Sequence, residues 1–162
     1  EGIKGAQAVA LCVFMARTKI AKDVIRSTIE KEFGYNLSLS CDNIRKVYRW
    51  GATCQDTVPQ AICAFLDSDS FEDAIRSAIS IGGDSDTLAC ITGSIAEPFY
   101  GIPNDIYQKG MSYLPKPLKD TVIVFESKFG NNILKNRHTA RDFFYLFLNK
   151  LKQGGILTIN KN

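Results

Sequence analysis

Apolar residues recur every three or four positions along much of the chain, and this spacing is the feature that most narrows the fold. Residues 21–33 and 71–79 show it most clearly. The spacing places their apolar side chains on one face of an amphipathic helix. Residues 3–16 and 88–96 are apolar nearly all round, which favours two helices at the centre of a bundle.

Helix boundaries are also marked in the sequence. Gly34 is expected to end the first amphipathic helix in a left-handed conformation. Ser70 is expected to cap the second helix, with Asp73 three residues later, and Gly101 to end the helix that contains residues 88–96.

The rest of the chain adds helices and one long irregular region. Further helices are predicted for residues 105–114, from Pro117 onward and for residues 139–151. Residues 121–125 have β propensity, but no alternating partner strands accompany them, so a helix is favoured. Residues 36–59 are expected to be irregular. The sequence therefore predicts an all-α fold.

Composition excludes several classes of protein. The chain is 45% hydrophobic and 23% charged, which is typical of a globular domain. Its longest apolar run, residues 8–16, is far shorter than the roughly 20 residues that cross a bilayer, and no signal peptide is recognisable. A cytoplasmic protein without a membrane partner is therefore expected. Five cysteines, no CxxC pair and one histidine, His138, disfavour a disulfide scaffold and a zinc site.

Charge is distributed unevenly. Residues 1–127 carry 13 basic and 16 acidic side chains, whereas residues 128–162 carry 7 basic and 1 acidic. The basic end is open to two interpretations, a solvated surface or a contact with an anionic partner. The solvated surface is favoured, and nucleic acid is not expected as a partner, because no recognised nucleic-acid-binding module is present.

The richest chemistry lies in residues 82–87, which read GGDSDT. Asp84, Asp86 and Thr87 place three oxygen ligands at the start of an apolar helix, and oxygen donors suit Mg²⁺, Mn²⁺ or Ca²⁺. Gly82 and Gly83 permit positive φ angles or a close approach to a ligand, and free N–H groups at the helix start suit a phosphate.

Other interpretations of this string are weaker. Asp84 could simply be an N-cap, with Asp86 complementing the helix dipole. However, the following helix implies burial, and two carboxylates entering a core need a cation. A phosphatase of the haloacid dehalogenase class requires a preceding buried strand, and an EF-hand fails because Ala89 and Ile95 occupy its glycine and glutamate positions.

Residues 48–50, Tyr-Arg-Trp, could line a nucleotide pocket by stacking and phosphate contact. Anchoring of this irregular segment to the core is the favoured alternative. Gln55, just before an expected helix start at residues 58–59, is a candidate hydrogen-bonding residue behind the site.

Several motifs together resemble the ADP-ribosylglycohydrolase family. Residues 82–89 (GGDSDTLA), followed by residues 93–96 and 100–103, carry the most specific part, and residues 1–10 and 54–61 add moderately specific matches. The resemblance covers about residues 1–130. Residues 131–162 are expected to be a basic extension with a docking helix.

The resemblance implies an orthogonal helical bundle around a binuclear Mg²⁺ centre, sometimes Mn²⁺. Such enzymes hydrolyse the N- or O-glycosidic bond that joins ADP-ribose to a protein side chain or a small acceptor, with a metal-held water attacking the anomeric carbon. Carried onto this chain, Asp84, Asp86 and Thr87 are metal ligands. Candidate substrate contacts are Gly82, Gly83, Ser85, Tyr48 and Gln55.

The resemblance also implies an incomplete site. The family's N-terminal half supplies further metal ligands and the acid/base carboxylate, and neither motif occurs in this chain, which begins Glu1-Gly2-Ile3. We therefore expect the C-terminal half of an enzyme, inactive alone, whose partner is the missing half or another chain, with self-association through the uncovered face. The alternative is a non-catalytic ADP-ribose-binding or oligomerising module derived from the same fold.

Overall fold

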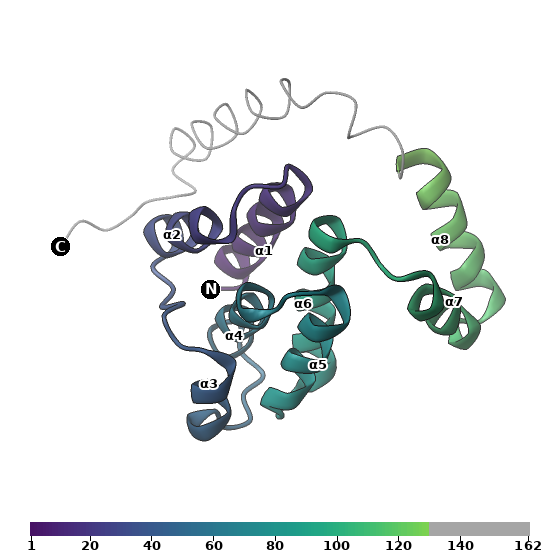
Figure 1. The fold of residues 1–162 in the computed structure, drawn as a ribbon. Helices are drawn as coiled ribbons and strands as arrows, with labels where there is room; N and C mark the ends of the chain where they lie inside the picture. The colour runs from purple at the N-terminus through teal and green to yellow at the C-terminus, as the bar shows by residue number, and fades with distance from the viewer. Residues whose placement is uncertain (130–162) are drawn as a thin grey trace. The chain divides into compact units, whose positions relative to one another are not determined.

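The computed structural model describes residues 1–129, which form eight α-helices and no strand (Figure 1). The described residues fall into two units, residues 1–101 and residues 102–129. The first unit contains α1 (Gly2–Arg17), α2 (Lys22–Phe33), α3 (Cys41–Val47), α4 (Cys54–Asp67), α5 (Phe71–Ile81) and α6 (Ser85–Tyr100). The described part of the second contains α7 (Asn104–Tyr113) and α8 (Lys116–Phe129).

The all-α prediction is confirmed over the described residues. Each predicted helix within residues 1–129 is present, and residues 121–125 belong to α8 despite their β propensity. The predicted boundaries also hold. Gly34 ends α2 at φ 65° and ψ 22°, and the Ser70 side chain accepts a hydrogen bond from the Asp73 N–H at the start of α5. The predicted helix over residues 139–151 and the basic extension lie outside the described residues.

The prediction of an irregular region over residues 36–59 was wrong. This region contains α3 and the beginning of α4, and each helix starts with a side-chain cap. The Ser40 side chain accepts from the Asn43 N–H, and the Thr53 side chain accepts from the Asp56 N–H. Helix α4 therefore begins at Cys54, several residues before the start that Pro59 suggested.

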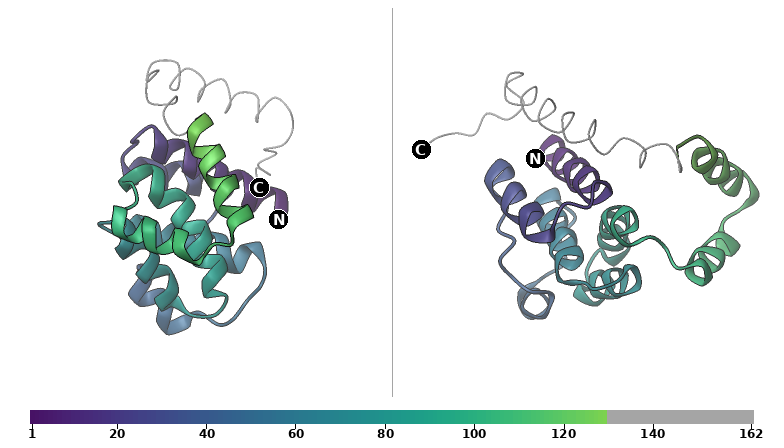
Figure 2. Two further views of the ribbon diagram at one scale, coloured as in Figure 1. Left: turned by 90° about the vertical axis from the view of Figure 1, so that its right-hand side faces the viewer. Right: turned by 45° about the horizontal axis from the view of Figure 1, so that its top comes forward.

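The core of the first unit is centred on α4 and α6. Helix α6 packs against α1, α4 and α5, which confirms its predicted central position. Helix α4 was not predicted to be central, yet its buried residues run almost without a break from Val58 to Leu66 apart from Pro59 and Gln60. Figures 1 and 2 show α1 and α2 on one side of α4 and α3 on the other.

Helix α1 is only partly buried, which corrects the prediction that it is central. It packs against α2, α4 and α6 through residues such as Leu11 and Met15, which are 0% and 1% exposed. Its other face carries Ile3, which is 75% exposed. Because residues 3–16 are apolar nearly all round, the sequence predicted more burial of this helix than the first unit shows.

Two lysines attach the α1–α2 region to the ends of the central helices. Lys22 donates to the carbonyls of Leu66 and Ser68, and its ammonium lies 5.2 Å from the centroids of the Phe65 and Tyr100 rings. Lys19 donates to carbonyls in the last turn of α6. Because the carbonyls at a helix C-terminus carry partial negative charge, these ammonium groups stabilise the ends of α4 and α6.

The second unit has a different character. Helices α7 and α8 bury none of their side chains. A 2.8 Å hydrogen bond from the Tyr107 hydroxyl to Glu126 links the two helices. No helix in residues 1–129 has both the length and the apolar character that a bilayer crossing requires.

Candidate metal site

The predicted metal motif lies in the turn between α5 and α6. Helix α5 ends at Ile81, and the chain reverses through Gly82 and Gly83, whose φ angles are 84° and 63°. Only glycine adopts such angles without strain, so both glycines are required by the turn. The sequence-based expectation of positive φ at these positions is confirmed.

Asp84 occupies the N-cap position of α6, as the simplest interpretation of the sequence expected. Its side chain, however, makes no capping hydrogen bond. The Asp84 carbonyl accepts from the Leu88 N–H at 3.0 Å, so the backbone starts the helix without help from the carboxylate. The half-buried carboxylate is therefore left for another role.

The expectation that two carboxylates enter the core was wrong. Asp86 and Thr87 are exposed in the first turn of α6, because that turn directs only Leu88 inward. The buried face of α6 is instead formed by Leu88, Thr92, Ile95 and Ala96. Burial of the two carboxylates therefore does not require a cation.

The carboxyl groups of Asp84 and Asp86 lie within hydrogen-bonding reach of each other. The pKa of Asp86 is lowered, first by the neighbouring Asp84 side chain and then by the backbone N–H groups of Asp86 and Thr87. Two neighbouring carboxyl groups and a hydroxyl are oxygen donors of the kind that Mg²⁺ and Mn²⁺ prefer, so the donor set of Asp84, Asp86 and Thr87 fits either cation.

The fit is partial. Within residues 1–129, no group of three or more acidic, histidine or cysteine side chains gathers around a single point. Mg²⁺ prefers six oxygen ligands in an octahedral arrangement. Asp84, Asp86 and Thr87 would therefore need waters, substrate oxygens or ligands from elsewhere to complete the shell.

Tyr48 lies against this turn although it is 35 residues earlier in the chain. A Cβ atom added to Gly83 would lie 2.6 Å from Cε1 of Tyr48, so the ring occupies the space that a side chain at position 83 would take. The pKa of the Tyr48 hydroxyl is raised, first by burial and then by the negative charges of Asp56 and Asp84, while the nearby backbone of Gly51 opposes the shift. The hydroxyl thus lies near both carboxylates.

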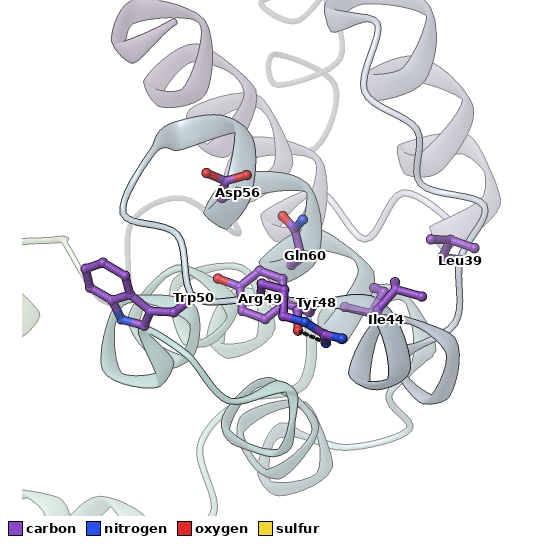
Figure 3. Close-up of a pocket in the computed structure, with 8 residues that line it drawn as sticks. Leu39, Ile44, Tyr48, Arg49, Trp50, Asp56 and Gln60 are labelled. Atoms are coloured by element: carbon purple, nitrogen blue, oxygen red, sulfur yellow. Dashed lines mark hydrogen bonds between the residues drawn. The ribbon is translucent and has the colours of Figure 1, made fainter.

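A pocket of about 320 Å³ opens beside Tyr48 (Figure 3). It is lined by Leu39, Ile44, Val47, Tyr48, Arg49, Trp50, Asp56 and Gln60. Two buried polar atoms on its wall, the Tyr48 hydroxyl and Oε1 of Gln60, donate to or accept from no side chain among the described residues. The pocket therefore offers an apolar floor and polar atoms that a ligand could satisfy.

The three residues at positions 48–50 behave differently from one another. Tyr48 packs against the motif, and the Arg49 guanidinium donates to the Tyr48 carbonyl at 3.0 Å. Trp50 is 73% exposed and extends away from the other side chains in Figure 3. The favoured anchoring interpretation was therefore wrong for Trp50.

Asp56 is the site residue that sequence reasoning missed. Its carboxylate accepts a 2.6 Å hydrogen bond from the Thr53 hydroxyl, and its atoms lie where a Cβ on Gly51 would fall. The capping pattern from Thr53 to Asp56 was the available signal. Gln55 is exposed and does not line the pocket, whereas Ser85 is half-buried directly after Asp84.

The helical architecture and this motif agree with the comparison to known proteins. Residues 1–122 match the ADP-ribosylglycohydrolase family, and the chain belongs to that family. Over 68 residues it is 37% identical to the ADP-ribosylarginine hydrolase Tri1 of Serratia proteamaculans (strain 568). The matched stretch covers 42% of this chain but 16% of that relative. No solved structure matches the chain significantly.

Proposed function

We propose that this chain carries part of the active site of a Mg²⁺-dependent hydrolase that releases ADP-ribose from modified arginine side chains. Membership of the family supports glycosidic hydrolysis of ADP-ribose conjugates, and the name of the Serratia relative supports arginine as the acceptor. The observation that carries the proposal is the Asp84 side chain, which stands at an N-cap without capping and lies beside the Asp86 side chain.

In this proposal Asp84, Asp86 and Thr87 hold Mg²⁺, or Mn²⁺ in its place, within a binuclear centre. When bound, the metal supplies Lewis-acid polarisation and orients the reacting groups. The chain itself contributes an electrostatic recognition element. The N-terminus of α6 presents the positive end of the helix dipole, which suits the diphosphate of ADP-ribose.

The residues around the motif are proposed substrate contacts. Gly82 and Gly83 leave the backbone of the turn without side chains, so that a ligand can approach it closely. Ser85 and Tyr48 lie next to Asp84 and Gly83. Gln55, which is exposed in the first turn of α4, is the weakest member of the set because the pocket does not include it.

Three oxygen ligands do not complete a binuclear centre. The proposal therefore requires further ligands and an acid/base carboxylate from another segment or another chain, and it predicts that residues 1–162 alone are inactive. Cytoplasmic location and self-association through uncovered apolar surface, such as that at Ile3, belong to the same proposal.

The first test is release of ADP-ribose by the intact gene product that contains this chain. Proteins ADP-ribosylated on arginine and, separately, on serine are incubated with Mg²⁺, with Mn²⁺ or with EDTA, and free ADP-ribose is measured by chromatography. We expect release from arginine that EDTA abolishes and that Mg²⁺ or Mn²⁺ restores. Absence of release from either substrate in the presence of both metals would reject the hydrolase.

A non-catalytic ADP-ribose-binding module is the second candidate. It is favoured by the shortage of ligands, because the described residues hold no group of three acidic, histidine or cysteine side chains. Saturable binding of ADP-ribose by calorimetry, together with no release from any conjugate, would select this candidate. Release of ADP-ribose would reject it.

A further inference from the structure

Tyr48 joins two parts of the first unit that are distant in the sequence. It follows α3 directly, whereas Gly83 lies in the turn before α6. The 2.6 Å separation between the Tyr48 ring and a Cβ placed on Gly83 means that the ring is in direct contact with the turn backbone. A shift of this ring would therefore displace the backbone of Gly83, the residue before Asp84.

The Tyr48 hydroxyl is placed for a hydrogen bond that it does not yet make. The oxygen is buried and donates to no acceptor among the described residues, although buried hydroxyl groups normally have one. Asp84 and Asp56 are the carboxylates whose charges reach it. Of these, Asp56 already accepts a hydrogen bond from the Thr53 hydroxyl at 2.6 Å. Asp84 directly follows Gly83, which the ring contacts, and its side chain makes no capping bond, so we take it as the acceptor.

We propose that Tyr48 is a positioning residue for the metal motif: its ring supports the Gly82-Gly83 turn, and its hydroxyl donates to Asp84 when that carboxylate turns to hold a divalent cation. This role rests on the metal-dependent function proposed above. Groups that hydrogen-bond to metal ligands fix the orientation of the ligand, and their loss commonly weakens metal binding 10- to 100-fold.

The chain offers a matched control for this role. Tyr35 is also buried, and its hydroxyl also lacks a hydrogen-bond partner within residues 1–129. Its neighbours are Lys4, whose ammonium lies 4.5 Å from the ring centroid, and the charges of Glu1 and Cys54. Removing the Tyr35 hydroxyl therefore shows what the loss of a buried tyrosine hydroxyl does when that hydroxyl is not beside the metal motif.

The experiment is a Mn²⁺ titration of the intact gene product, followed by electron paramagnetic resonance, for wild type, Tyr48→Phe and Tyr35→Phe. We expect Tyr48→Phe to weaken Mn²⁺ binding about tenfold, because the phenyl ring still fills its place while the donor is lost. Tyr35→Phe should bind Mn²⁺ as wild type does. Thermal unfolding of both variants should match wild type, which separates positioning from stability.

Two kinds of failure can be told apart. If wild type binds Mn²⁺ and Tyr48→Phe binds it equally well, the positioning role is rejected while the proposed function stands. The role is also rejected if Tyr35→Phe weakens binding as much as Tyr48→Phe. If wild type neither binds Mn²⁺ nor releases ADP-ribose, the metal-dependent function is rejected, and the role of Tyr48 is rejected with it.

Discussion

Two aspartates at equivalent helix positions differ in their neighbours, and this difference sets their proposed roles. Asp23 and Asp86 are both exposed aspartates in the first turn of a helix. Asp86 differs in having the Asp84 carboxyl within hydrogen-bonding reach. A helix dipole explains an aspartate at either position. It does not by itself explain two aspartate side chains placed next to each other at one helix start, which is the arrangement proposed to hold a cation.

The cysteines provide a prediction at the residue scale. Burial raises the pKa of Cys12, Cys41 and Cys63 to about 12 each, so these thiols stay protonated and unreactive at about pH 8. Cys90 is exposed on α6. Iodoacetamide should therefore label Cys90 in the folded protein, with Cys12, Cys41 and Cys63 labelled only after unfolding. Peptide mass spectrometry reads each site, and equally fast labelling of a buried thiol would contradict the assignment.

Among the structural elements, the turn between α5 and α6 restricts its residues most, because position 83 needs a glycine. Gly83 and Gly34 have nearly the same φ, 63° and 65°, but an added Cβ would meet a neighbour within 4 Å only at Gly83, where it meets the Tyr48 ring. Gly34→Ala should lower the free energy of unfolding by about 1–2 kcal/mol, the cost of left-handed backbone. Gly83→Ala should lower it further, because the Tyr48 ring must move. Urea denaturation measures both, and equal losses would argue against the contact.

The elements also show which parts of the fold could be predicted. Helices with regular apolar spacing, such as residues 21–33 and 71–79, were predicted because burial on one face leaves a periodic signal. Helix α3 was missed because seven residues with only Cys41 and Ile44 buried are too few to show a period. The start of α4 was missed because Pro59 was interpreted as a boundary, whereas Thr53 supplies the cap.

The site was predictable only where its residues are adjacent in the sequence. Asp84, Asp86 and Thr87 stand in one string, so oxygen-ligand chemistry could be inferred from their types and spacing. The contact of Tyr48 with Gly83 depends on how α3 and α5 pack against each other. No local pattern encodes that distance, and the same holds for the approach of Asp56. The outward direction of Asp86 also depends on which face of α6 the neighbouring helices cover.

At the scale of the whole molecule, the described units differ in how well they bury apolar surface. The first unit has a continuous core around α4 and α6, whereas α7 and α8 of the second expose large apolar side chains such as Tyr113 and Phe125. The match to the Serratia relative covers only 16% of that protein. The complete active site is proposed to need more than the three oxygen ligands proposed for this chain.

The proposed metal-dependent function rests on Asp84 and Asp86, and one measurement tests it directly. Mg²⁺-dependent release of ADP-ribose from arginine-modified protein is compared for the intact gene product, Asp84→Asn, Asp86→Asn and the matched control Asp23→Asn. We predict that Asp84→Asn and Asp86→Asn each lower the rate about 100-fold or more, because each removes a ligand charge from the metal. Asp23→Asn should retain the wild-type rate. Wild-type rates in both motif variants would contradict the assignment of these carboxylates to the metal.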